Sequence, residues 1–174
     1  MAGWDATKEQ LTAHAPVYLR RVPKSGSWRL PDTGNDPGAV EHCTACFKDN
    51  QGISVWRIET DADTARVVAG MNDRRDPMHN EQVVLCLTEA DLDSAGARIR
   101  RSPGLAGCGY AKDRHFDIEY DPERVRALIR VLHAREARTV KLNKNSMKDA
   151  ISEAAGSGCR VHAEAPSCPC PPAS

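Results

Sequence analysis

The sequence predicts a single α+β domain with a mixed, mostly antiparallel sheet and helices packed on it. Three observations favour this fold class. The 174 residues fit one hydrophobic core. Hydrophobic residues make up 40% and charged residues 28% of the chain, as in an ordinary globular domain. Strand patterns alternate with helix patterns, and the first three strands group as neighbours in a sheet.

The first strands are predicted in the N-terminal third of the chain. "VYLRRV" (17–22) is apolar, contains β-branched and aromatic residues and ends at a proline, which predicts a short strand. Residues 24–40 are rich in Gly, Pro, Asn and Asp and predict a surface loop. "CTACF" (43–47) and "ISVWRI" (53–58) predict two strands of a hairpin joined by the turn "KDNQG".

The middle of the chain predicts a helix, a strand and a second helix. "TDADTARVVAG" (60–70) carries an Asp cap, an acidic first turn and a terminal glycine, which are helix signals. "QVVLCLT" (82–88) is continuously apolar, so we expect a strand at the sheet centre with both faces covered. Thr88 is the predicted cap of a helix with apolar positions Leu92, Ala95 and Ile99.

The most regular helix pattern follows a half-buried strand. After a Gly-rich loop at 100–114, "HFDIEYDP" (115–122) alternates apolar and polar residues, as strands do. Asp121 is the predicted cap and Pro122 the first residue of an amphipathic helix that reaches about Arg138. Its expected buried stripe is Val125, Leu128, Ile129 and Leu132.

The C-terminal segments complete the domain. We expect a short strand at 139–143, a helix at 146–156 capped by Ser146, and a last strand at 159–164. "APSCPCPPAS" (165–174) contains too much proline to pack and predicts a disordered tail. The predicted domain therefore comprises residues 1–164.

The composition of the chain narrows the kinds of partner that it could bind and the compartments in which we expect it. With 24 basic and 24 acidic residues the net charge is zero, so any attraction to a polyanion must come from a local patch. Seven cysteines at irregular spacing favour reduced thiols in a cytoplasmic protein. The first ten residues lack a signal-peptide pattern. The longest apolar run, "VVLCL", is far shorter than the roughly 20 residues that cross a bilayer.

The segment "EHCTACF" raises the question of a metal site, because His42 stands beside a C-x-x-C pair. A structural zinc site commonly uses four ligands from two such pairs, and this chain has one. An extended segment would also point Cys43 and Cys46 to opposite faces. We therefore predict neither a metal ion nor a cofactor, with the cysteines filling core space. Cys108, in a Gly-rich loop, is a candidate nucleophile. We favour the other interpretation, in which this cysteine has only a structural role.

An alternative catalytic site rests on arginine and glutamate. One of Arg20 and Arg21 must face a covered side of the sheet, where a charge usually has an anionic partner, and an ordinary ion pair is the simpler interpretation. Glu119 lies on the polar face of a later strand, near His115. The common hydrolase, zincin, phosphate-loop and Rossmann motifs do not occur in the sequence.

This layout of an early arginine and a later glutamate resembles that of ADP-ribosyltransferases, although the Ser-Thr-Ser and E-x-E elements of such enzymes are not visible here. The resemblance implies that Arg20 or Arg21 grips a dinucleotide phosphate and that Glu119 orients its ribose. The alternative function is therefore a small transferase or hydrolase acting on a nucleotide-type ligand through Arg20, Arg21, His115 and Glu119.

A basic surface gives the function that we favour from the sequence. Between Pro122 and Lys148 there are eight Lys or Arg and two Glu, a local charge of +6. Clustered cations release counterions from a phosphate backbone, so we expect a binding or accessory protein that uses this basic helix and the Gly-rich loops to contact nucleic acid or an acidic protein partner. The other interpretation is a solvated helix face neutralised by "ETDAD" and "TEADLD". The predicted binding residues are Arg126, Arg130, Arg138, Lys141 and Lys144.

Overall fold

The predicted α+β fold is confirmed by the computed structural model, which describes residues 2–23, 26–30, 36–47, 53–71, 81–102, 109–135 and 138–157. Within these ranges six strands form one sheet in the order β4-β5-β2-β1-β3-β6. Each neighbouring pair is antiparallel. The strands are β1 Val17–Val22, β2 Ile53–Ile58, β3 Gln82–Thr88, β4 Ile99–Arg101, β5 His115–Ile118 and β6 Thr139–Leu142.

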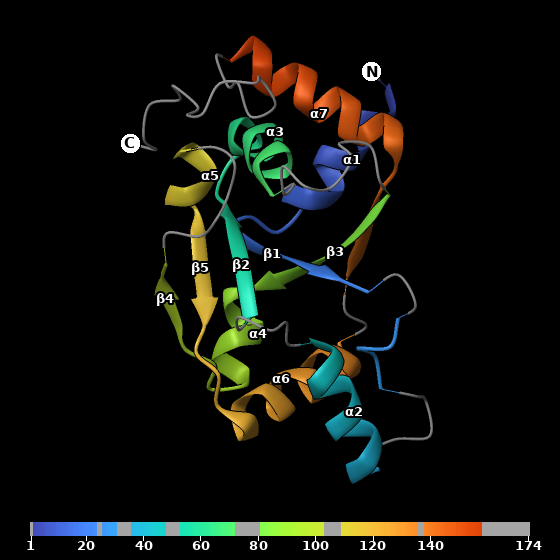
Figure 1. Cartoon of the computed structure of the whole chain (residues 1–174), viewed down its shortest axis with the longest axis vertical. Coiled ribbons are helices and arrows are strands. Elements are labelled where there is room, and N and C mark those ends of the chain that lie inside the picture. The colour runs from blue at the N-terminus through green and yellow to red at the C-terminus, as the bar shows by residue number, and fades with distance from the viewer. Residues whose placement is uncertain are drawn as a thin grey trace.

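Helices cover both faces of this sheet (Figure 1). One face carries α1 Ala2–Thr12, α3 Asp61–Gly70, α5 Gly109–Asp113 and α7 Lys144–Gly156. The other face carries α2 Pro37–Phe47, α4 Glu89–Ser94 and α6 Pro122–Ala134. Alternation along the central strand β1 feeds both cores, because Val17 and Leu19 join the first while Tyr18 and Val22 join the second.

Helix α6 forms where its cap and periodicity predict it. The Asp121 carboxylate accepts a hydrogen bond from the backbone N–H of Arg124 at 3.0 Å, and Pro122 occupies the first turn. The cap at Thr88 is likewise confirmed, because its hydroxyl accepts from the backbone N–H of Asp91 at 3.2 Å. The buried stripe of α6 is the predicted one: Val125, Leu128, Ile129 and Leu132.

The predicted hairpin of 43–47 with 53–58 is wrong, because 43–47 lies in helix α2. Asp36 accepts from the backbone N–H of Ala39 at 3.0 Å and Pro37 is the first helical residue, so the helix begins inside the predicted loop. Strand β2 pairs with β1 and β5 instead. The buried residues of α2 recur at helical spacing: Val40, Cys43, Thr44 and Phe47.

Other boundaries also differ from the prediction. Helix α4 ends at Ser94, and Ile99 begins edge strand β4. Strand β3 lies next to edge strand β6 rather than at the sheet centre. Thr60 and not an Asp caps α3. Asn143 caps α7, and Ser146 is buried inside it.

Two helices form where the sequence analysis expected none. Helix α1 occupies residues 2–12, and α5 occupies 109–113 within the predicted Gly-rich loop. The predicted strand at 159–164, the tail at 165–174 and Cys108 lie outside the described residues. None of the described helices has the length and apolar character needed to span a membrane.

Candidate nucleic-acid interface

Acidic side chains of α6 itself and of other segments neutralise most of the cations of α6. Arg126 donates from Nε and Nη2 to Glu41 Oε2 at 3.0 and 2.6 Å, and from Nη1 to Glu123 at 2.5 Å. At the end of the helix, Arg135 donates to Asp91 Oδ1 at 2.9 Å. The predicted neutralisation by "TEADLD" is therefore present on this helix, whose exposed Arg130 has no ion pair among the described residues.

The remaining cations gather along edge strand β6 and the start of α7. Arg138 precedes β6, Lys141 lies within it, and Lys144 and Lys148 occupy the first turns of α7. All four side chains are exposed. Lys141 contacts Glu81 at 2.9 Å, whereas the other three have no acidic partner in the described part of the chain. We call these four residues the β6 edge strip.

The β6 edge strip extends from the edge of the sheet to the start of a helix. Arg138 and Lys144 lie on either side of β6, whose four residues span roughly 13 Å at about 3.3 Å per residue of strand. Lys144 and Lys148 are one helical turn apart and lie on the same side of α7. The strip therefore runs past the edge of the sheet and onto the helix layer beside it.

A further arginine joins this surface from a distant loop. Arg29 is exposed, and its Nη2 donates to Thr139 Oγ1 in β6 at 2.8 Å. Its guanidinium also stacks 5.1 Å from the ring centroid of Trp28. Sequence analysis missed Arg29, because its place beside β6 depends on a contact with a residue 110 positions away.

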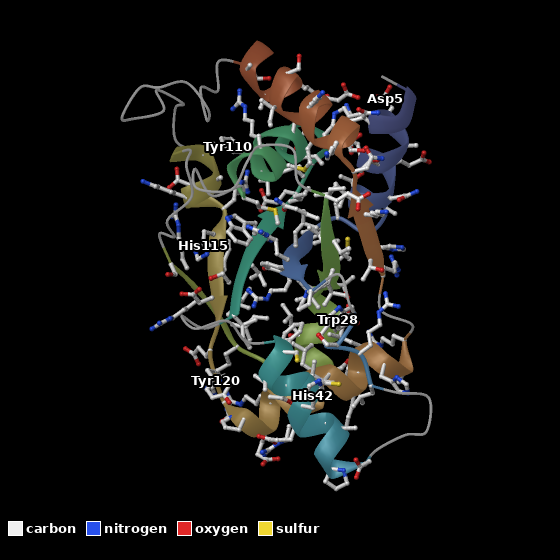
Figure 2. The ribbon with its side chains drawn as sticks, turned by 45° about the vertical axis from the view of Figure 1, so that its right-hand side comes forward. Asp5, Trp28, His42, Tyr110, His115 and Tyr120 are labelled. Carbon is white, nitrogen blue, oxygen red and sulfur yellow. The ribbon has the colours of Figure 1, made fainter. Side chains whose placement is uncertain are left out.

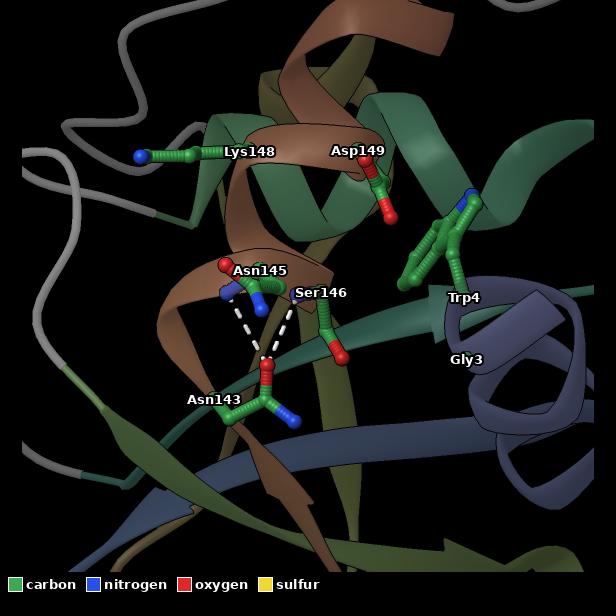
Figure 3. Close-up of a pocket in the computed structure, with 7 residues that line it drawn as sticks. All are labelled: Gly3, Trp4, Asn143, Asn145, Ser146, Lys148 and Asp149. Atoms are coloured by element: carbon green, nitrogen blue, oxygen red, sulfur yellow. Dashed lines mark hydrogen bonds between the residues drawn. The ribbon is translucent and has the colours of Figure 1, made fainter. Parts of the chain in front are cut away.

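A small polar pocket opens between the starts of α1 and α7, with a volume of about 370 Å³ (Figure 3). Asn143 Oδ1 accepts from the backbone N–H groups of Asn145 and Ser146 at 2.9 Å each, so the start of α7 is capped by its own chain. Trp4 Nε1 donates to Glu153 at 2.7 Å, which fixes the indole as a wall of the pocket. The lining residues are Gly3, Trp4, Asn143, Asn145, Ser146, Lys148 and Asp149.

The residues of the alternative catalytic site do not lie together. Arg20 is buried on the α2 side of the sheet, where Nη2 donates to the Phe47 carbonyl at 2.8 Å and Nη1 to the Ser54 carbonyl at 3.1 Å. These two backbone carbonyls are partners that the sequence analysis did not anticipate. Arg21 follows it and is half-buried.

His115 and Glu119 lie elsewhere. His115 is buried on the α5 side of the sheet, with Nδ1 donating to the Ser102 carbonyl at 2.5 Å and its ring 5.0 Å from that of Trp56. Glu119 is exposed just beyond β5. Because Arg20 and His115 face opposite layers of helices, the structure does not bring them into one cleft.

A buried ionic cluster ties α3 to α5 on this side of the molecule. Asp63 Oδ2 accepts from the backbone N–H groups of Glu59 and Thr60 at 3.0 and 2.9 Å, and Oδ1 accepts from the Tyr110 hydroxyl and from Arg114 Nη2 at 3.4 Å. Burial alone would raise the pKa of Asp63, but these donors outweigh it and lower the pKa. Burial and Asp63 together raise the pKa of Tyr110. Figure 2 labels Tyr110 on α5 and His115 on β5, both in the left half of the view.

The buried thiols of Cys43 and Cys86 lie in different elements, α2 and β3. Cys43 points inward from α2 and donates to the Arg29 carbonyl at 3.1 Å, and burial raises its pKa. Burial raises the pKa of Cys86, in β3, to about 12. Among the described residues, no three or more His, Cys, Asp or Glu side chains gather in a way that could hold a metal ion.

Comparison with known proteins finds no matching family model and no significant match to a curated protein or a solved structure.

Proposed function

We propose that this protein binds nucleic acid through the β6 edge strip, with Arg29 at its flank. The observation that carries the proposal is that Arg138, Lys144 and Lys148 are exposed, follow one another along one edge of the fold and have no acidic partner among the described residues. A cationic side chain without an internal ion pair can contact a phosphate and release its counterion directly. A cationic side chain that is already in an ion pair must first break that pair.

A nucleic acid fits this surface better than an acidic protein does. A stable protein interface normally has an apolar or aromatic core inside a polar rim. The exposed large hydrophobic side chain in the described ranges is Tyr120. It follows β5, which lies next to the edge of the sheet opposite β6. The β6 edge strip offers charge without such a core, and charge alone is sufficient for sequence-independent binding to phosphates.

The test is the fluorescence anisotropy of labelled DNA, single-stranded and duplex, over a salt series. Four phosphate contacts give a slope of about −3 to −4 for the logarithm of affinity against the logarithm of salt concentration, which is roughly a hundredfold loss between about 50 and about 200 mM salt. Replacing Lys144 and Lys148 by Glu should weaken binding at least tenfold and reduce the slope to about −2, because two contacts are removed.

The matched control is Arg98→Glu with Arg100→Glu, on the β4 side at the opposite edge of the sheet. Both side chains are exposed, and this pair changes the net charge by the same amount. Equal losses from the two double substitutions would show that overall charge and not the β6 edge strip governs binding. An acidic peptide that binds as tightly as DNA at the same salt would identify an acidic protein as the partner instead.

A further inference from the structure

Helix α2 carries an exposed histidine and a half-exposed cysteine one turn apart. His42 is exposed and Cys46 is half-exposed, and His42 Nε2 lies 3.7 Å from Cys46 Sγ. This arrangement exists because 43–47 is helical, since positions i and i+4 share a face of a helix. The extended conformation expected from the sequence would have separated the two side chains. Figure 2 shows His42 on α2, at the opposite end of the molecule from Tyr110.

The separation of the two donor atoms matches the bite of a metal chelate. Bond lengths of about 2.3 Å from zinc to sulfur and about 2.0 Å from zinc to imidazole nitrogen, at a tetrahedral angle, place the donors about 3.5–3.6 Å apart. The observed 3.7 Å lies within about 0.2 Å of this value. The same i, i+4 spacing on a helix serves the two histidines of zinc peptidases.

The neighbouring polar side chains of α2 are committed elsewhere. Glu41 accepts two hydrogen bonds from Arg126, and Cys43 faces the core and donates to the Arg29 carbonyl. Thr44 is buried and donates to the Val40 carbonyl at 2.7 Å. His42 Nε2 and Cys46 Sγ lie within hydrogen-bonding reach of each other, and neither side chain has another hydrogen bond or ion pair in the described ranges. Cys46 is half-exposed and packs partly against the core beneath α2. Apart from each other, the two donor atoms therefore have no polar partner that competes with a ligand.

We propose that His42 and Cys46 form a two-ligand site for zinc or another borderline transition-metal ion. Thiolate and imidazole are the donors that such ions prefer. On binding, the Cys46 thiol releases its proton to solvent as the metal–sulfur bond forms, and His42 donates the Nε2 lone pair while Nδ1 keeps its hydrogen. Because zinc is usually four-coordinate, two protein ligands leave two positions of the ion for water.

The experiment titrates cobalt(II) into the full-length reduced chain and follows the near-ultraviolet absorption of the cobalt–thiolate bond. We expect the band in the wild-type protein, its loss on adding zinc, its absence in Cys46→Ser, and at least about tenfold weaker binding in His42→Ala. His133→Ala, which removes an exposed histidine from α6, is the matched control and should bind as the wild type does.

A second readout separates this pair from the other cysteines of the chain. Zinc should slow the alkylation of Cys46, measured by peptide mass spectrometry, and the protection should disappear in His42→Ala. Circular dichroism of each variant confirms that α2 is retained. No cobalt band in the wild type, a band that persists in Cys46→Ser, or protection that is independent of His42 would each overturn the assignment.

Discussion

At the residue scale, Asp63 shows how one carboxylate fixes two helices. Its Oδ2 closes the capping box at the start of α3. Its Oδ1 accepts hydrogen bonds from Tyr110, in α5, and from Arg114, which directly follows α5. The residue is only 3% exposed. A buried carboxylate with this number of donors is stabilised in its charged form. Asp63 therefore couples the short helix α5, which has little local stability of its own, to the body of the domain.

Asp63→Asn should lower the free energy of unfolding at neutral pH and make it less dependent on pH in the acid range. The pKa of Asp63 is lowered from 3.8 by folding, so the carboxylate contributes stability above the unfolded pKa, and this contribution is lost as pH falls through the folded pKa. We expect a loss of about 1–3 kcal/mol in the free energy of unfolding near neutral pH, which shrinks below about pH 4. Urea unfolding at several pH values measures both quantities.

The exposed Asp93 provides the control for that experiment. Asp93→Asn removes a carboxylate from α4 that has no side-chain partner among the described residues, so it should leave the stability profile unchanged. If Asp63→Asn followed the wild-type profile through the acid range, the carboxylate would not be ionised in the folded state, and the account of the cluster would be wrong.

At the element scale, the sequence predicts those elements whose signals are local. Helix α6 has a cap, a proline in its first turn and an apolar stripe, and β3 has an unbroken apolar run. Helix α2 was mistaken for a strand because "CTACF" is short and apolar, and such runs do not separate helix from strand. The signal that could have identified it is Asp36 before Pro37, a cap followed by a favoured first residue.

The candidate interface was only partly predictable for a related reason. The exposure of Lys141 and Lys144 follows from their places in β6 and α7, which the sequence analysis located approximately. The neutralisation of Arg126 by Glu41 and the position of Arg29 at Thr139 depend on contacts between distant segments. No local pattern records such contacts, so the sequence could not separate paired cations from unpaired ones.

The end of α2 depends on a buried arginine from the sheet. Arg20 donates to the carbonyl of Phe47, the last residue of α2, where the helix dipole places partial negative charge. Arg20→Met keeps the aliphatic volume but leaves this carbonyl and that of Ser54 without their donor. We expect a loss of about 1–3 kcal/mol in the free energy of unfolding and faster amide hydrogen exchange in the last turn of α2.

Arg100→Met is the matched comparison, because Arg100 is an exposed arginine of edge strand β4. It should change neither the free energy of unfolding nor exchange in α2 beyond experimental error. Equal effects from the two substitutions, or unchanged exchange at the end of α2 in Arg20→Met, would show that the helix ends there without help from Arg20.

At the scale of the whole molecule, one sheet separates two cores that do not mix. Ile58 of β2 belongs to the core under α1, α3, α5 and α7, whereas Ile129 of α6 belongs to the core under α2, α4 and α6. The strands are common to both cores, since alternate residues of β1 enter each. Loss of either helix layer exposes one face of the same strands, so we expect the two layers to unfold together.

A double-mutant cycle tests this architecture. Ile58→Val and Ile129→Val should each cost about 0.5–1.5 kcal/mol, and the double variant should equal their sum within about 0.5 kcal/mol, because the two residues lie in different cores. Val17 opposes Ile58 across β1 and β2 in the same core, so Val17→Ala with Ile58→Val should depart from additivity. Tryptophan fluorescence and far-ultraviolet circular dichroism should report one coincident urea transition. Two separated transitions would contradict the prediction that the two layers unfold together. Coupling between Ile58 and Ile129 as strong as that within one core would contradict the separation of the two cores.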